Sequence, residues 1–203
     1  MKHKKLVYGV GTNNADYAVV KYETTEVNGV KKQKLVWRCA YYQAWKHMIE
    51  RCYSAKLQEQ YPTYRGCTVS NDWLVFSKFK AWMEKQDWEG KDLDKDILIE
   101  GNKVYSADTC VFVTRMVNTF TIDRGAARGD WSIGVHWHKA AGKFRSMCSN
   151  PFTRKQESLG LFKTEQEAHN AWAKRKLELA HELAAIQTDP RVAKALIDCY
   201  SKL

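Results

Sequence analysis

Residues 134–172 read GVHWHKAAGKFRSMCSNPFTRKQESLGLFKTEQEAHNAW, and the apolar spacing of this segment changes from that of strands to that of a helix. Three β-prone runs are separated by two turn signals, Ala141-Gly142 and Asn150-Pro151. The runs cover residues 131–139, 143–149 and 157–163. The pattern predicts three antiparallel strands joined by short turns.

A long helix is predicted directly after the third run. Thr164 and Glu167 are three residues apart at the start of an apolar-periodic segment that extends to residue 186, which is the pattern of a capping box. Pro190 ends this segment, and residues 192–200 predict a shorter helix. We therefore expect a three-stranded antiparallel sheet packed on one long helix, followed by another helix.

The chain before this region predicts a hairpin and two helices. Asn28-Gly29 separates two β-prone runs, which is typical of a hairpin turn. Residues 41–57 and 69–86 carry apolar residues at helical spacing. Ser70 or Asn71 is expected to cap the second helix.

Residues 93–120 complete the N-terminal part. They predict a strand at 96–99, a Gly-Asn turn, a short strand and a helix, which together make a ββα unit. The predicted fold class is therefore α+β. We expect an N-terminal helical and ββα domain over 1–120, a linker over 121–130, and the sheet–helix domain over 131–203.

Charge and composition narrow the class of partner. Among 203 residues there are 33 Lys and Arg against 23 Asp and Glu, with eight Trp and ten Tyr, which favours nucleic acid. No apolar run approaches the roughly 18 residues of a membrane helix, so no membrane association is expected. The six cysteines form no C-x-x-C pair, which predicts reduced thiols in the cytoplasm and no zinc site.

Alternation along the strands places basic side chains on one sheet face. His136 and His138 lie on one face of the first strand, and Val135 and Trp137 lie on its other face. Lys143 and Arg145 lie together on one face of the next strand. Such a sheet fits the major groove of duplex DNA. The residues predicted to contact DNA are His136, His138, Lys143, Arg145, Arg154, Lys155, Arg124 and Arg128.

Two other interpretations of this face stay open. The first is a solvated basic surface without a partner. The second is a metal site at His136 and His138, but no third ligand lies near them in sequence, which disfavours it.

The region 131–185 resembles the Apetala-type (ethylene-response-factor-like) DNA-binding domain. The resemblance rests on Gly134-Val135, Gly142-Lys143-Phe144, Leu159-Gly160-x-Phe162, the helix start Thr164-Glu165-Gln166-Glu167-Ala168, and Trp172. That family reads the major groove with its sheet, which implies contacts from His136, His138, Lys143, Arg145 and Lys155. Where the family has an arginine after Gly-Val, this chain has His136.

Residues 38–185 as a whole resemble phage-encoded proteins related to the HNH homing endonucleases, many of which carry an Apetala-type domain. The matching motifs are Trp45-x-x-Met48-x-x-Arg51-Cys52-Tyr53, Tyr64-x-Gly66-Cys67-x-Val69, Asp72-Trp73-x-x-Phe76-x-x-Phe79, Leu93-Asp94-Lys95-Asp96 and the run from Tyr105 to Val113, ending in Asn118. The family's first-strand histidine, a general base, is replaced by Asp94-Lys95-Asp96, and Thr109 stands where the pattern has Asn. Asn118 matches the final site position.

These observations give two functional hypotheses. The preferred one is a DNA-binding protein on a degenerate HNH scaffold, acting as a regulator or against a host protein, with a host or phage protein as a second partner. The alternative is a Mg²⁺-dependent HNH-like endonuclease with Asp94, Asp96, Lys95 and Asn118 in catalysis. Its metal ligands would be Asp94, Asp96 and Asp108, because Mg²⁺ prefers carboxylate oxygen. A protein-interaction module whose basic face is incidental is a third interpretation.

Overall fold

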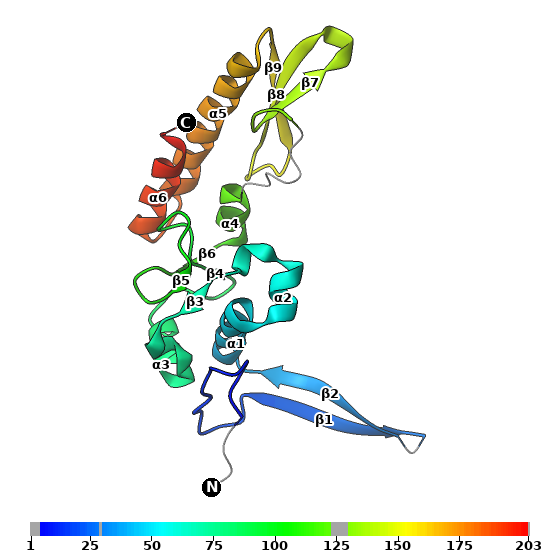
Figure 1. Ribbon diagram of the computed structural model, residues 1–203, viewed down its shortest axis with the longest axis vertical. Helices are drawn as coiled ribbons and strands as arrows, with labels where there is room; N and C mark the ends of the chain where they lie inside the picture. The colour runs from blue at the N-terminus through cyan, green and yellow to red at the C-terminus, as the bar shows by residue number, and fades with distance from the viewer. Residues whose placement is uncertain (1–4, 29, 123–129, 203) are drawn as a thin grey trace. The chain divides into compact units, whose positions relative to one another are not determined.

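The computed structural model describes residues 5–28, 30–122 and 130–202, and the chain divides into two compact units, residues 1–112 and 113–203. The architecture is mixed α and β, with small sheets and helices (Figure 1). In the described part of the chain, no helix has the length and apolar character needed to span a membrane. The predicted linker at 121–130 falls largely on residues 123–129, outside the described residues.

The described residues of the first unit form three α-helices and three two-stranded sheets. The helices are α1 (Ala40–Tyr53), α2 (Ala55–Gln60) and α3 (Phe76–Met83), and the strands are β1 (Val20–Val27), β2 (Val30–Arg38), β3 (Thr68–Val69), β4 (Asp92–Asp94), β5 (Val104–Tyr105) and β6 (Val111–Val113). β1 pairs with β2 in antiparallel fashion, β3 with β5 in parallel, and β4 lies in a sheet with β6. The hairpin predicted around Asn28 is thus confirmed.

Trp45 of α1 is the centre of the core of this unit. Its side chain is fully buried, and its indole Nε1 donates to the carbonyl of Trp73 at 2.7 Å. Gly11 lies against the same indole, because a Cβ added at position 11 would lie 2.9 Å from two of the ring carbons. Four of the apolar residues at helical spacing in 69–86, Trp73, Phe76, Phe79 and Met83, are buried in this core, and Trp82 packs against them.

The helix predicted over 69–86 is interrupted, and the predicted cap is wrong. A short 3₁₀ turn at Asn71–Leu74 ends at Val75, whose backbone is extended, and α3 begins only at Phe76. The interruption is caused by a residue far away in sequence, Thr12. Thr12 N donates to the Leu74 carbonyl at 2.8 Å, and Phe76 N donates to the Thr12 carbonyl at 3.0 Å. This bridge needs an extended residue at position 75, so the helical run cannot continue through it.

The strand predicted at 96–99 is also wrong, because the strand lies earlier, at β4. The Asp94 carboxylate accepts from the backbone N–H groups of Asp96 at 2.8 Å and Ile97 at 2.7 Å, which turns the chain. The next strand, β5, pairs with β3 and not with its predecessor. The local hairpin of the expected ββα unit is therefore absent from the described residues.

The second unit has the predicted sheet and long helix. Its elements are α4 (Arg115–Thr121), β7 (Val135–His138), β8 (Lys143–Ser149), β9 (Gln156–Phe162), α5 (Glu165–Ala185) and α6 (Pro190–Tyr200). The sheet has the antiparallel order β7-β8-β9, and α5 runs along it (Figure 1). The Thr164–Glu167 capping box is confirmed. Pro190 does not precede the last helix but forms its first turn, with Asp189 as the cap.

Candidate nucleic-acid interface

Four predicted DNA contacts come together on one face of the sheet. His136 lies directly opposite Arg145, and His138 directly opposite Lys143, across the β7–β8 pair. Directly opposed residues in an antiparallel pair point to the same side of the sheet. His136 and Lys143 are exposed, and His138 and Arg145 are partly exposed. The result is a compact block of two imidazoles and two cations.

The other face of the sheet packs on α5. Val135, Ser146 and Cys148 are buried there. Glu157, which lies opposite Cys148, also belongs to this side, and its carboxylate is bound by Arg175 of α5. The Arg175 hydrogen bond, followed by that of Asn150, lowers the pKa of Glu157. The acidic side chain of the sheet is thus neutralised from the helix, which leaves the opposite face basic.

Arg145 is held in position on the exposed face. Its Nε donates to the hydroxyl of Ser158 on β9 at 3.3 Å. Ser158 reaches this face because the register of β8 and β9 shifts between Ser146 and Met147, so that Met147 pairs with Ser158. Sequence alternation without this bulge would have placed Leu159 there, which is why Ser158 was missed.

His138 already has one ring nitrogen engaged. Its Nδ1 accepts from the backbone N–H of Ala141 at 3.2 Å and caps the short 3₁₀ turn at Lys139–Ala141. Only Nε2 remains for an external partner, as a donor in the neutral ring. In the described parts of the chain, no three His, Cys, Asp or Glu side chains form a group that could hold a metal ion.

The remaining predicted contacts lie elsewhere or outside the described residues. Arg154 and Lys155 belong to the β8–β9 turn, where Asn150 Oδ1 accepts from Phe152 N at 2.8 Å and fixes the turn. Because β8 spans seven residues, this turn is about 20 Å from Lys143. Arg124 and Arg128 lie in the segment 123–129, outside the described residues.

An aromatic trio at the β7–β8 end was not predicted as a surface feature. Phe144 packs edge to face with Trp137, with ring centroids 4.9 Å apart, and with Trp131 at 5.1 Å. Trp137 and Trp131 nevertheless stay exposed, by 45% and 38%. The only sequence signal was the density of aromatic residues, and the alternation rule assigned Trp137 to the covered face.

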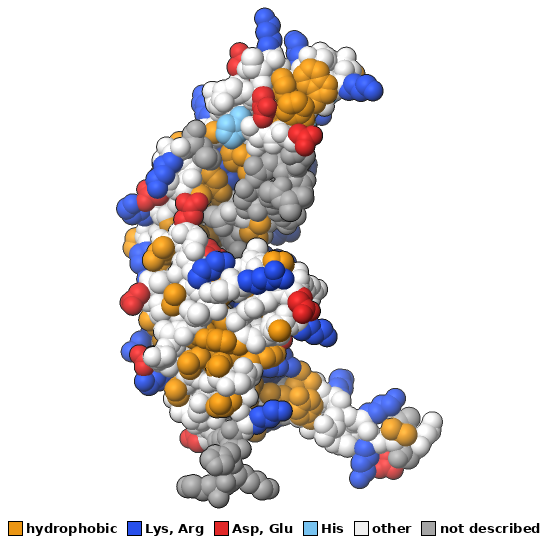
Figure 2. Space-filling view, viewed as in Figure 1, with side chains coloured by type: hydrophobic (Ala, Val, Ile, Leu, Met, Phe, Trp, Pro, Cys, Tyr) orange, Lys and Arg blue, Asp and Glu red, His pale blue; other side chains and the backbone are white. Residues whose placement is uncertain are grey.

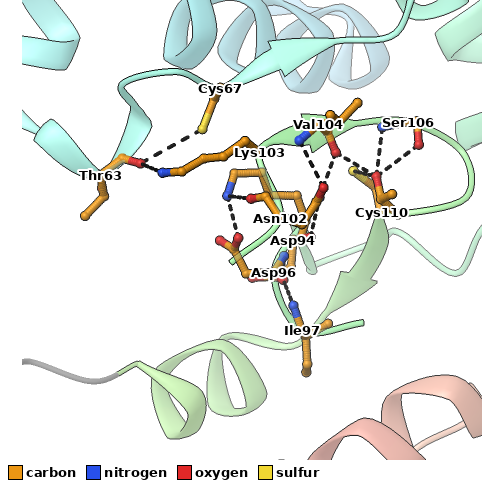
Figure 3. A network of polar contacts seen from close by, with 12 residues as sticks. Thr63, Cys67, Asp94, Asp96, Ile97, Asn102, Lys103, Val104, Ser106 and Cys110 are labelled. Atoms are coloured by element: carbon orange, nitrogen blue, oxygen red, sulfur yellow. Dashed lines mark hydrogen bonds and ion pairs between the residues drawn. The ribbon is translucent and has the colours of Figure 1, made fainter. Parts of the chain in front are cut away.

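The predicted catalytic segment Asp94-Lys95-Asp96 forms a network within the first unit (Figure 3). Lys95 is buried, and its Nζ donates to Asp96 at 2.5 Å and to the Asn102 carbonyl at 2.8 Å. The Asn102 side chain donates back to the Lys95 carbonyl at 2.8 Å. These bonds close the loop between β4 and β5, and they engage the Lys95 ammonium with groups of its own chain.

The other predicted catalytic and metal positions lie in separate segments of the chain. Asp108 is exposed and belongs to no metal-holding group among the described residues. Asn118 lies on α4, in the second unit. Burial raises the pKa of Asp94, and its two backbone hydrogen bonds oppose that rise. Thr109 closes a turn by donating to the Val104 carbonyl at 2.7 Å.

A cavity of about 320 Å³ lies beside α1 in the first unit. His47, Arg51, Trp88 and Asp92 are among the residues that line it. Burial and then the nearby Arg51 charge lower the pKa of His47, which favours its neutral form. No sequence pattern predicted this cavity.

Comparison with known proteins gives no relative. No family model matches the chain, and neither a curated protein nor a solved structure matches it.

Proposed function

We propose that the protein binds duplex DNA, with the exposed face of β7, β8 and β9 against the major groove. The observation that carries this proposal is the separation of charge across the sheet. His136, Lys143 and Arg145 lie on the open face, while Glu157 is paired with Arg175 on the covered face. A surface from which acidic groups are withdrawn favours a polyanion.

The dimensions of the sheet support the same partner. Three strands spaced about 4.8 Å apart are about 10 Å across, and the major groove is about 12 Å wide. Lys143 begins β8 and Lys155 lies in the turn between β8 and β9, so their cations would span several base pairs along the groove. The hydrogen bond to Ser158 uses Nε of Arg145. The two terminal guanidinium nitrogens would then donate to a guanine edge or a phosphate.

In this proposal the first unit is a scaffold without nuclease activity, related to the HNH proteins that its motifs resemble. Two observations support binding over cleavage: Asp94 accepts two backbone hydrogen bonds, and Lys95 is buried in the β4–β5 loop. The alternative, a Mg²⁺-dependent endonuclease, would need Asp94 and Asp96 to leave these partners for a metal. Regulation of a host or phage process is the role that we propose for such a binder.

The test is a titration of a labelled duplex at several salt concentrations. Lys143→Ala with Arg145→Ala removes two central cations, and Lys174→Ala with Lys202→Ala removes two exposed cations elsewhere in the same unit. We expect the first pair to weaken binding by roughly 10- to 100-fold and to reduce the slope of log K against log salt by about 2. Equal effects of both pairs, or no binding by the natural protein at low salt, would contradict the proposal.

A further inference from the structure

The ribbon formed by β1 (Val20–Val27) and β2 (Val30–Arg38) has exposed side chains on both of its faces. Every β2 residue from Val30 to Trp37 is exposed, including Leu35 at 40% and Trp37 at 43%. Tyr22 of β1 is 55% exposed. A two-stranded hairpin without a packed face is marginally stable in water. The ribbon therefore gains from a surface that covers one of its faces.

The base of the ribbon is fixed to the core of the first unit. Cys39 N donates to the Val19 carbonyl at 2.9 Å, directly below the ribbon. The preceding segment is also held, because Thr12 bridges to Val75 and Gly11 lies against Trp45. The ribbon is thus attached to the core at its base, and its two strands extend away from that base (Figure 1).

The two faces of the ribbon differ in charge. The pairs Glu23–Lys34 and Thr25–Lys32 share one face, together with Lys21. Lys21 Nζ lies 5.5 Å from the centre of the Trp37 ring. This face, which we call the cationic face, carries three lysines against Glu23. Tyr22 and Leu35 lie on the other face, where Glu26 opposes Lys31.

We propose that the ribbon is a second DNA-binding element, which lies in a groove of the duplex with its cationic face toward the phosphates. This inference rests on the proposed function. A ribbon of two strands fits the major groove, and eight residues extend it over about 26 Å. Lysine side chains lie along the ribbon (Figure 2). Lys21 and Trp37 pair a cation with an aromatic ring at its base.

Charge also decides against a second copy of the chain as the occupant. Residues 20–38 contain four lysines and Arg38 against Glu23 and Glu26, a surplus of three positive charges. Two ribbons stacked on their cationic faces would bring six lysines together, which is unfavourable. A polyanion is the partner that this surplus favours.

The experiment compares two charge-matched variants of the full chain on a duplex of about 30 base pairs. The ribbon variant is Lys21→Gln, Lys32→Gln and Lys34→Gln, and the control is Lys56→Gln, Lys85→Gln and Lys174→Gln, all of exposed lysines. Because the substituted side chains are exposed, both variants should fold, which thermal unfolding checks. We expect the ribbon variant to bind at least 10-fold more weakly than the control, with a salt slope lower by about 2 to 3 and a shorter hydroxyl-radical footprint.

The possible outcomes separate this inference from the proposed function. If Lys143→Ala with Arg145→Ala weakens binding while the ribbon variant behaves like its control, the ribbon inference fails and the proposed function stands. If the natural protein binds no duplex at low salt, the proposed function is wrong and the ribbon inference is wrong with it. If sedimentation without DNA shows a dimer that only the ribbon variant loses, the occupant is a second copy and the inference is wrong.

Discussion

Gly134 lies so close to the indole of Trp172 that a Cβ at position 134 would lie 2.1 Å from Cδ1 and 2.2 Å from Cγ. The Gly134 carbonyl also accepts from Met147 N at 2.9 Å. The residue is therefore fixed between β8 on one side and α5 on the other. This contact sets how closely the start of β7 approaches the helix, and so how the open sheet face is presented.

Gly134→Ala should destabilise the second unit strongly. Its φ of +81° costs about 1 to 2 kcal/mol for an L-residue, and displacing Trp172 adds about 1 to 3 kcal/mol. Gly142→Ala is the matched control, because Gly142 also has a positive φ, +59°, but a Cβ there meets nothing within 4 Å. Urea unfolding of both variants isolates the contact with Trp172. Equal losses would show that backbone strain alone matters.

Glu157→Gln should lower stability at neutral pH by about 1 kcal/mol or less, since the pair with Arg175 is partly exposed. The pKa of Glu157 is lowered in the folded protein, first by Arg175. Its contribution is therefore present above the unfolded pKa of about 4.3 and is lost as the pH falls through the folded value. Urea midpoints of the two proteins should differ at pH 7 and converge below pH 4. Glu89→Gln, an exposed carboxylate of the first unit, is the control.

Lys176 should make the stability of the second unit rise with pH. Its Nζ donates to the Phe120 carbonyl at 2.9 Å, and burial lowers its pKa from 10.5 to about 8. The unfolded chain then binds more protons between pH 8 and 10.5, so stability increases across that window, by roughly 3 kcal/mol at about 1.4 kcal/mol per pH unit. The Phe120 carbonyl keeps a second donor, Tyr200 Oη, when Lys176 is replaced.

The measurement for Lys176 is urea unfolding of Lys176→Met and of Lys174→Met between pH 7 and 10.5. Lys174 is exposed on the same helix and keeps the dependence of the natural protein. Burial raises the pKa of the Cys148 thiol, and this makes stability fall as the pH rises, opposite to the effect of Lys176. The quantity to compare is therefore the difference in stability between each variant and the natural protein at each pH. If the difference in unfolding free energy between Lys176→Met and the natural protein is constant over this pH range, Lys176 is not the group that makes stability rise with pH.

Local signals predicted the parts of the fold that depend on neighbours in sequence. The Thr164–Glu167 cap and the turn at Asn28 are decided within a few residues, and both formed as expected. The break at Val75 could not be predicted, because it depends on Thr12, which is 63 residues away. The apolar run after Asp96 has β-propensity, but the Asp94 side chain takes the backbone N–H groups that a strand would use.

In the candidate interface, too, only the features that depend on neighbours in sequence could be predicted. Alternation alone groups His136 with His138 and Lys143 with Arg145. Which side chains support that face depends on register, and the bulge that brings Ser158 to Arg145 accompanies Gly160, at a φ of +129°. The pairing of Glu157 with Arg175 joins residues from different elements and left no periodic signal.

Asp94→Asn and Asp94→Ala separate a structural role of this carboxylate from a metal-binding one. Asn keeps an oxygen that accepts from Asp96 N and Ile97 N, whereas Ala removes both bonds, so we expect Ala to cost about 1 to 2 kcal/mol and Asn clearly less. In a plasmid-nicking assay with Mg²⁺ or Mn²⁺, the natural protein should then give no more nicked circles than Asp94→Asn. Metal-dependent nicking that the folded Asp94→Asn protein lacks would instead favour the endonuclease. It would mean that Asp94 exchanges its backbone partners for a cation when DNA is bound.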